Sequence, residues 1–221
     1  YTLGAVAPLA AMDMTLCMGA SISAIHGFNK ALGEQSQGKT VAVIGDSTFM
    51  HSGMTGLANA VFNKHDVLLV ILDNGTTAMT GHQPNPGVCT SVLGEGCNHL
   101  DIESVVRGIG VTDVAKVKPF NMRGTLKTIE EMKARSGVRV IIAEEPCMLF
   151  ARRTLKQNRP QVAEVATQGE EALKCLAELA CPAFRRGGTA EAPVVSVDES
   201  QCSGCMVCLQ VTPAIRARKR S

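Results

Sequence analysis

Two apolar runs of strand length, 41–44 and 67–72, each end in a cluster of polar, turn-forming residues. The first cluster contains Asp46 and the second contains Asn74. If a helix joins the two runs, they become neighbouring parallel strands, and both oxygen-bearing side chains lie at strand C-termini. Open α/β sheets hold their ligands at that edge. The sequence therefore predicts a parallel sheet with a ligand site formed by Asp46 and Asn74.

The residue types at this edge indicate the ligand. One carboxylate, one amide oxygen and a nearby backbone carbonyl suit a Mg²⁺ ion that keeps its other positions for phosphate oxygens. The short residues Gly45 and Ser47 let a diphosphate approach the N-terminus of the next helix, where free N–H groups favour anions. A helix cap is the alternative role for Asp46, but its pairing with Asn74 favours the ligand. We predict a magnesium diphosphate cofactor.

The rest of residues 1–150 alternates between helical and strand patterns. Apolar residues at three- and four-residue steps predict a helix over 19–32 with Ile22, Ile25, Phe28 and Leu32 on its buried face. Further helices are expected over 54–63, 102–108 and 121–135, and strands over 113–117 and 138–143. A long loop is expected over 74–99, and loops of this length are usually functional or disordered. The alternation predicts an α/β domain with a doubly wound parallel sheet.

The chain changes character beyond about residue 150, where the sequence is charged and alternates poorly. We expect the cofactor-binding domain over 1–150, a linker over 151–173 and a small C-terminal α+β module over 174–221. The basic segment 216–220 is expected to be a solvated tail.

Charge and cysteine content narrow the class of protein. A net charge of +2 favours neither a nucleic acid nor a membrane surface as partner, and no apolar run is long enough for a transmembrane helix. Nine cysteines without a secretory signal indicate a reducing, cytoplasmic compartment. The cysteines are therefore expected to serve metal or redox chemistry rather than disulfides.

The last cysteines have the spacing of an iron–sulfur motif. Cys202, Cys205 and Cys208 follow the Cys-x₂-Cys-x₂-Cys pattern of bacterial ferredoxins, but Thr212 replaces the usual fourth cysteine before a proline. Cys181, which precedes a proline in an earlier segment, can replace it, because that cysteine ligates the other cluster in two-cluster ferredoxins. We predict one [4Fe–4S] cluster held by Cys181, Cys202, Cys205 and Cys208, in a ferredoxin-like module. The alternative is decay of the whole module.

A second cluster is predicted to be lost. It would need ligands at 169, 172, 175 and 212, where Gly169, Ala172 and Thr212 cannot ligate. Cys175 is therefore expected to be dispensable for the remaining cluster. Four further cysteines have no ligand spacing and are expected to be ordinary thiols: Cys17, Cys89, Cys97 and Cys147.

Four blocks of the chain, taken in order, resemble one enzyme family. They are Tyr-Thr-Leu-Gly-Ala at 1–5, Cys-Met-Gly-Ala-Ser at 17–21, Gly-Asp-Ser-Thr-Phe-Met-His-Ser-Gly at 45–53 and Asp-Asn-Gly-Thr-Thr-Ala-Met-Thr-Gly-His-Gln-Pro at 73–84. The last two resemble the thiamine diphosphate signature. Together the blocks resemble the large subunit of indolepyruvate ferredoxin oxidoreductase, a thiamine diphosphate-dependent 2-oxoacid:ferredoxin oxidoreductase. The resemblance covers residues 1 to about 149 and resumes, degraded, from about 174 to 215.

This resemblance implies a reaction and its partners. The expected reaction is the oxidative decarboxylation of an aryl 2-oxo acid, indolepyruvate, with coenzyme A, passing electrons through the [4Fe–4S] cluster to ferredoxin. A smaller β subunit is the expected partner. The pyrimidine-binding domain with its activating Glu is expected upstream, so this fragment is not expected to be active alone. Two alternatives stay open: a non-oxidative thiamine diphosphate-dependent decarboxylase, and a non-catalytic electron-transfer or assembly subunit.

Single residues also receive expected roles. By resemblance, the backbone carbonyl of Thr76 is the third Mg²⁺ ligand beside Asp46 and Asn74. Residues that fit a close approach to the diphosphate are Gly19, Gly45 and Ser47.

Four longer side chains beside the site each have two possible roles. Met18 and Met79 are expected either against the cofactor rings or in the core. His51 and His82 are expected either to meet the substrate carboxylate or a reacting proton, or to be structural.

Overall fold

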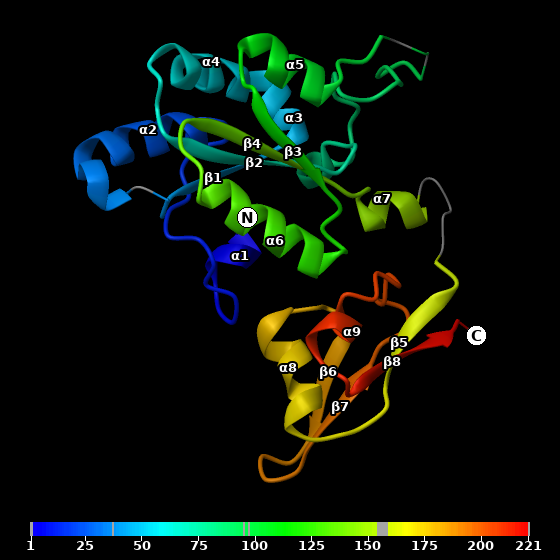
Figure 1. The fold of residues 1–221 in the computed structure, drawn as a ribbon. Coiled ribbons are helices and arrows are strands. Elements are labelled where there is room, and N and C mark those ends of the chain that lie inside the picture. The colour runs from blue at the N-terminus through cyan, green and yellow to red at the C-terminus, as the bar shows by residue number, and fades with distance from the viewer. Residues whose placement is uncertain (1, 37, 95, 97, 154–158, 221) are drawn as a thin grey trace. The chain divides into compact units, whose positions relative to one another are not determined.

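The structure is a computed structural model that describes residues 2–36, 38–94, 96, 98–153 and 159–220. The chain divides into two compact units, Leu16–Ala151 and Tyr1–Thr15 together with Arg152–Ser221. We call the first the cofactor unit and the part of the second from Arg159 onward the cysteine module. Figure 1 shows the elements of each unit.

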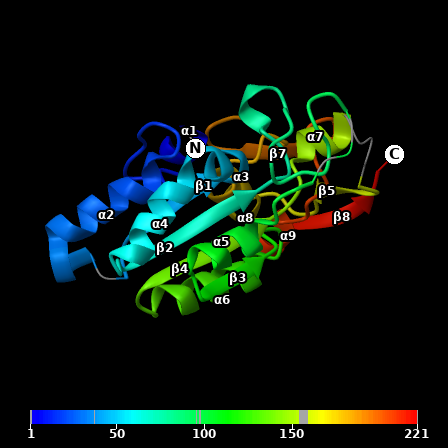
Figure 2. The ribbon, with the colours of Figure 1, turned by 90° about the horizontal axis from the view of Figure 1, so that it is seen from above.

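The cofactor unit is built on a parallel sheet with the strand order β1-β2-β4-β3. Its strands are β1 (Val41–Gly45), β2 (Val67–Asp73), β3 (Asp113–Val117) and β4 (Val138–Glu144). The predicted strands are confirmed, with ends that differ by one residue at most. Figure 2 shows β2 and its neighbours running in the same direction.

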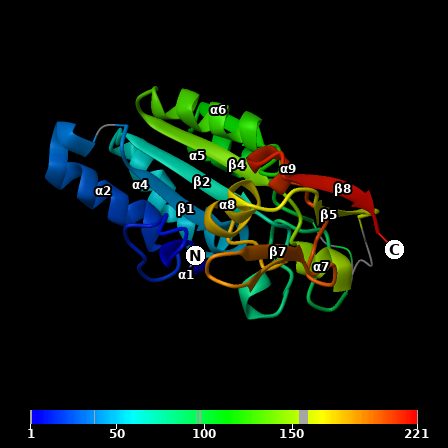
Figure 3. The same cartoon turned by 90° about the horizontal axis from the view of Figure 1, so that it is seen from below.

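Helices cover both faces of this sheet, so the predicted doubly wound arrangement is confirmed. The helices on one face are α2 (Ala20–Leu32), α4 (Met54–Phe62) and α5 (Ile102–Ile109). Helix α6 (Met122–Lys133) packs on the other face through Met132, and Figure 3 shows it alongside β4.

Strand β2 lies at the centre of the core. Val67, Leu69 and Ile71 are fully buried against α2, α4 and α5, whereas Leu68 is buried on the α6 side. Successive strand residues point to opposite faces. A strand covered on both sides therefore reads as the continuous apolar run seen in the sequence.

Helix α2 differs from its predicted apolar stripe. Ile22 and Ile25 are buried, but Phe28 is 48% exposed and Leu32 is 39% exposed. His26 is buried on this helix instead. The spacing of the apolar residues correctly predicted the helix. The buried face of the helix, however, ends before Phe28 and is shorter than the spacing indicated.

The long loop after β2 has little regular structure in its described part. It contains the short 3₁₀ helix η3 (Ala78–Thr80) and two isolated bridges, Thr77 with Gln83 and Thr90 with Gly96. The expected loop over 74–99 is confirmed.

The cysteine module contains two antiparallel strand pairs and two helices. Strand β5 (Gln161–Val165) pairs with β8 (Ile215–Lys219), and β6 (Phe184–Gly188) pairs with β7 (Pro193–Val197). The helices are α8 (Glu170–Glu178) and α9 (Cys208–Val211), and two further short helices of the chain are α1 (Thr2–Ala5) and α7 (Met148–Arg153).

Two expectations for this region are wrong. The segment expected to be a linker, 151–173, contains β5 and the start of α8. The segment expected to be a solvated tail, 216–220, lies mostly in β8, because its backbone pairs with β5. The sequence did not indicate this strand, because most of its residues are basic. Its apolar residue Ile215 is buried.

In the part of the chain that the structure describes, no helix is long and apolar enough to cross a membrane.

Candidate functional site

Asp46 lies where β1 meets the helical segment that follows it. The chain runs from Gly45 into α3 (Asp46–Thr48), a π-helical turn η2 (Phe49–Gly53) and then α4. The Asp46 side chain is buried, and its Oδ1 accepts a hydrogen bond from the Ser47 N–H at 2.8 Å. Its Oδ2 accepts from the Gly75 N–H at 3.1 Å and from Asn85 Nδ2 at 3.3 Å. Asp46 thus joins the helix start to the loop after β2.

Burial raises the pKa of Asp46, and the hydrogen bonds from Ser47, Asn85 and Gly75 oppose this shift. Burial and the negative charge of Asp46 also raise the pKa of Asp73. The negative charge of Asp46 thus destabilises the charged form of the half-buried Asp73. A bound cation would relieve this cost, and hard oxygen ligands suit Mg²⁺. The donor set at this edge is therefore compatible with the expected ion.

Asn74 and Thr76 lie within one tight turn beside Asp46. Asn74 Oδ1 accepts a hydrogen bond from the Thr76 N–H at 3.0 Å, and the Thr76 carbonyl accepts from the Ala78 N–H at 2.9 Å. Thr76 is buried. The structure therefore brings the three expected magnesium ligands together at the carboxyl ends of β1 and β2. Their role as ligands stays a prediction.

No group of three or more His, Cys, Asp or Glu side chains among the described residues could hold a single metal ion. The expected magnesium set contains only one carboxylate, together with an amide oxygen and a backbone carbonyl. The expected magnesium set therefore does not count as a group of three His, Cys, Asp or Glu side chains.

Gly19 precedes α2 and touches the π-helical turn. Its φ is +90°, and a Cβ placed there would lie 2.1 Å from Ser52 Oγ. Only glycine allows this approach. Ser47 lies one residue into the helical segment, where its Oγ accepts a hydrogen bond from Thr77 Oγ1 at 2.8 Å. The expected diphosphate residues thus surround the start of the helical segment.

The two histidines have different surroundings. His51 is exposed within η2, and π-helical turns occur frequently at functional sites. His82 has a φ of +65°, stacks on Phe150 at 5.5 Å between ring centroids, and lies 3.7 Å from Cys147 Sγ through Nε2. Contact with substrate stays a prediction for both.

The two methionines are not core residues. Met18 is 65% exposed and Met79 is 69% exposed. The core alternative is therefore wrong for both, and contact with the cofactor rings stays their predicted role.

Sequence reasoning missed two residues of the loop. Asn85 is buried, donates to Asp46 and accepts from the Gly87 N–H at 2.8 Å. Thr77 bonds Ser47. The only signal for Asn85 was its position between two prolines, which restricts the backbone and holds the amide in one orientation.

The four cysteines predicted as cluster ligands are electrostatic neighbours, and their role as ligands stays a prediction. Cys202 and Cys208 are buried, and Cys181 and Cys205 are half-buried. Burial raises the pKa of the Cys208 thiol to about 12, and negative charge on the other cysteines, Cys175 among them, acts in the same direction. Cys202, Cys208 and Cys175 belong to a small apolar core, and Cys181 packs against it. Soft thiolates in an apolar shell suit an iron–sulfur cluster.

Three of the positions that a second cluster would need for its ligands are buried. Ala172 and Cys175 are fully buried, and Thr212 is 2% exposed. The Thr212 hydroxyl donates to Glu171 Oε2 at 2.9 Å and accepts from the Ala214 N–H at 3.2 Å. Thr212 thus stabilises the local backbone, and Gly169 begins α8 with a φ of +110°.

The remaining cysteines are scattered. Cys17 is exposed, Cys147 contacts His82, and exposed Cys89 lies 3.3 Å from His99 Nδ1. Cys97 lies outside the described residues. The described three occupy separate places, in agreement with their lack of a ligand spacing.

Comparisons with known proteins agree with this geometry. A family model described as the C-terminal TPP binding domain of thiamine pyrophosphate enzymes matches residues 5–143. The indolepyruvate oxidoreductase subunit IorA of Archaeoglobus fulgidus is 41% identical over 96% of this chain and 33% of its own length. The subunit of the same name from Methanothermobacter thermautotrophicus is 42% identical over 97% of this chain and 33% of its own length. The chain spans about a third of the length of these relatives.

A solved 2-oxoglutarate:ferredoxin oxidoreductase from Magnetococcus marinus matches 59% of this chain and 46% of its own with a TM-score of 0.51 and 17% identity. This likeness supports the fold alone. The resemblance to the large subunit of indolepyruvate oxidoreductases is confirmed by the relatives. Since the family model covers more than half of the sequence, the chain belongs to the thiamine pyrophosphate enzymes and carries their C-terminal cofactor-binding domain.

Proposed function

We propose that this chain is part of a thiamine diphosphate-dependent oxidoreductase that oxidatively decarboxylates aryl 2-oxo acids such as indolepyruvate. The 2-oxo acid loses CO₂, and its acyl carbon becomes the thioester of coenzyme A. Ferredoxin would accept the two electrons released, a [4Fe–4S] cluster would supply one-electron transfer when bound, and the thiol proton of coenzyme A goes to solvent. The relatives' printed name is the basis for the substrate.

The observation that carries this proposal is the buried carboxylate of Asp46, which accepts a hydrogen bond from the N–H of Gly75, the residue after Asn74, at the carboxyl edge of a parallel sheet. When bound, thiamine diphosphate supplies the nucleophile and the electron sink for decarboxylation. Asp46, the Asn74 amide and the Thr76 carbonyl would hold the Mg²⁺ that binds its diphosphate.

Other residues of the loop have supporting roles in the proposal. Asn85 and Thr76 are buried and exclude water from the carboxylate of Asp46. His82 is fixed by its turn and by Phe150, so its ring can hold or move a proton at a constant position. His51 is proposed as a second proton-carrying group.

The electron route rests on Cys181, Cys202, Cys205 and Cys208. Cys202 and Cys208 are buried in an apolar core, and Cys181 and Cys205 are partly open to solvent, which supports a cluster that can pass electrons outward. We propose a smaller β subunit as partner, ferredoxin as acceptor and the cytoplasm as location.

The experiment uses the full-length protein with its small subunit under anaerobic conditions. Reduction of ferredoxin or a viologen dye is compared for indolepyruvate, phenylpyruvate and pyruvate, with and without coenzyme A. Aryl-specific reduction that requires coenzyme A is expected. Release of CO₂ without dye reduction would identify a non-oxidative decarboxylase. Silence with every 2-oxo acid, despite bound cofactor, would identify a non-catalytic subunit.

A further inference from the structure

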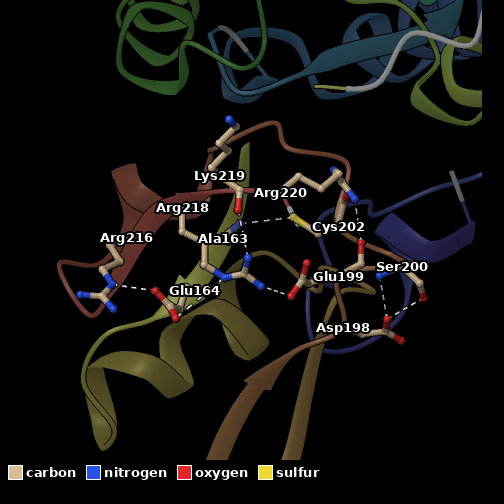
Figure 4. Close-up of polar contacts among 10 residues, drawn as sticks. All are labelled: Ala163, Glu164, Asp198, Glu199, Ser200, Cys202, Arg216, Arg218, Lys219 and Arg220. Carbon is tan, nitrogen blue, oxygen red and sulfur yellow. Dashed lines mark hydrogen bonds and ion pairs between the residues drawn. The ribbon is translucent and has the colours of Figure 1, made fainter. Parts of the chain in front are cut away.

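Three arginines occupy alternate positions at the end of the chain: Arg216 and Arg218 lie in β8 and make charge pairs, and Arg220 follows directly after the strand. Arg216 Nε lies 2.7 Å from Glu164 Oε2, and Arg218 pairs with Glu164 and Glu199. Figure 4 shows these pairs side by side. The Arg216 side chain is 66% exposed. Exposed pairs of this kind contribute little to stability.

Arg220 differs because its guanidinium donates to backbone carbonyls. Its Nη2 donates to the carbonyl of Cys202 at 2.7 Å, Nη1 to that of Glu199 at 3.1 Å, and Nε to that of Arg159 at 3.4 Å. The Arg220 N–H also donates to the Pro160 carbonyl at 2.8 Å. One side chain therefore ties the segment before Cys202 to the segment before β5. Figure 4 shows Arg220 beside Glu199 and Cys202.

Cys202 is fixed from other directions as well. Its Sγ accepts the Ala163 N–H of β5 at 3.5 Å, and its own N–H donates to the Asp198 carbonyl at 3.0 Å. The side chain is 7% exposed. The loop also approaches β5 closely at Gly204, where a Cβ would lie 2.6 Å from the Gln161 carbonyl oxygen.

We propose that Arg220 is a positioning residue for Cys202, and that its charge raises the reduction potential of the cluster that Cys202 would hold. This inference rests on the proposed [4Fe–4S] cluster. A guanidinium is planar, always charged and donates in several directions at once, which suits three carbonyls. A positive charge beside the ligand favours the reduced cluster, which carries one more negative charge.

The test uses the full-length protein with its small subunit after anaerobic reconstitution. Three variants are compared with wild type: R220Q, R220K and R216Q. The measurements are iron content, the EPR spectrum of the reduced cluster, its midpoint potential, and the rate of iron loss to a chelator. R216Q is the matched control, because Arg216 belongs to the same run of alternating arginines and bonds Glu164 rather than the cysteine loop.

R220Q is expected to lower the equilibrium constant for one-electron reduction by up to about tenfold, which is about 59 mV. It is also expected to lose iron several times faster and to broaden the EPR signal. R220K keeps the charge, so its potential is expected near that of wild type. Its compact ammonium cannot span three carbonyls, so iron loss is expected to be faster than in wild type. R216Q is expected to match wild type.

Two results would overturn the inference: R220Q with the potential and iron loss of wild type, or R216Q with changes as large as those of R220Q. If R220Q does not fold, R220K decides, and wild-type iron retention in R220K overturns the positioning role. Wild-type protein that binds no iron would instead refute the proposed cluster, which separates that failure from the failure of the Arg220 role.

Discussion

The cofactor unit and the cysteine module are proposed to hold different ligands. In the cofactor unit, oxygen donors meet because parallel strands end at one edge, so Asp46 and Asn74 come from distant positions. In the cysteine module, three of the sulfur donors lie in one short loop, and β5 and Arg220 fix that loop from outside. Hard oxygens suit Mg²⁺, and soft thiolates suit iron. The geometry of the first proposed site depends on the order of the parallel strands. The geometry of the second depends on the contacts that hold the cysteine loop in place.

The largest expected effect tests the first half of this comparison. Asp46→Asn removes the charge but keeps the shape and one oxygen acceptor. Because both oxygens of the buried Asp46 accept hydrogen bonds, the amide NH2 loses one acceptor site, and the melting temperature without cofactor is expected to fall by several degrees. Affinity for thiamine diphosphate with Mg²⁺ is expected to fall more than about a hundredfold, since even loss of an outer partner costs about 10–100-fold. Calorimetric titration of the full-length protein measures this.

A graded variant sharpens that result. Asn85→Ala removes a hydrogen bond to Asp46 without touching an expected ligand, so a loss of about 10–100-fold is expected. Asn63→Ala is the control, because this exposed amide bonds Asn59 within α4 and its cap. Equal affinity in all three variants would contradict the assignment of Asp46.

The second prediction concerns which thiols the module needs. Cys181→Ser is expected to abolish the cluster, whereas Cys175→Ser is expected to keep about four irons per chain. Cys175 is fully buried, so the serine hydroxyl is expected to cost about 1–3 kcal/mol of stability. Iron analysis after anaerobic reconstitution measures the first effect. About eight irons in wild type, or loss of iron in both variants, would contradict the single-cluster ligand set.

The third prediction tests whether close backbone contact fixes the cysteine loop. Gly204 and Gly169 both have positive φ, but a Cβ at Gly204 meets Gln161 and Arg159, whereas a Cβ at Gly169 meets nothing within 4 Å. Gly204→Ala is expected to destabilise the module by about 3 kcal/mol and Gly169→Ala by about 1 kcal/mol. Amide hydrogen exchange of β5 and β8 measures the difference. Equal losses would show that backbone strain alone decides.

Sequence predicted the cofactor unit better than the module, for a physical reason. A buried parallel strand needs a continuous apolar run and ends in a turn, so the limits of β2 and the position of Asn74 were readable. The role of Asn85 could not be predicted, because its contact with Asp46 depends on how an irregular loop folds back. The exposed Phe28 was also misread, because periodicity does not state how far a neighbour reaches.

In the module, the cysteine spacing was readable but the structure around it was not. Strand β8 was missed because its alternate positions carry charged side chains that resemble a solvated tail. Those charges are paired across β5 or with backbone carbonyls, which a sequence without pairing partners cannot show. The segment 151–173 was predicted to be a linker for the same reason, because the pairing of β5 with β8 cannot be read from either segment alone.

The smallest expected effect concerns acid stability, and it distinguishes the two regions again. In the cofactor unit, buried His26 accepts from Asn59 Nδ2 at 3.3 Å and stacks on His65 at 4.7 Å between centroids. Its Nε2 has no hydrogen-bond partner among the described residues. Burial, and then the charge of His65, lower the pKa of His26. The buried thiol of Cys208 in the module, whose pKa is raised to about 12, stays neutral in acid.

The sign follows from proton binding. The unfolded chain takes up the His26 proton near pH 6.5, whereas the folded chain does so only at lower pH, so folding opposes protonation. This contribution to stability is complete above about pH 6.5 and is lost as the pH falls toward the folded pKa, by about 1.4 kcal/mol for each unit of depression. Urea unfolding at about pH 7.5 and about pH 5.5 is expected to show this slope in wild type and not in His26→Phe. His65→Gln removes only the second cause, so an intermediate slope is expected, and equal slopes in wild type and His26→Phe would show that another group makes the cofactor unit acid-sensitive.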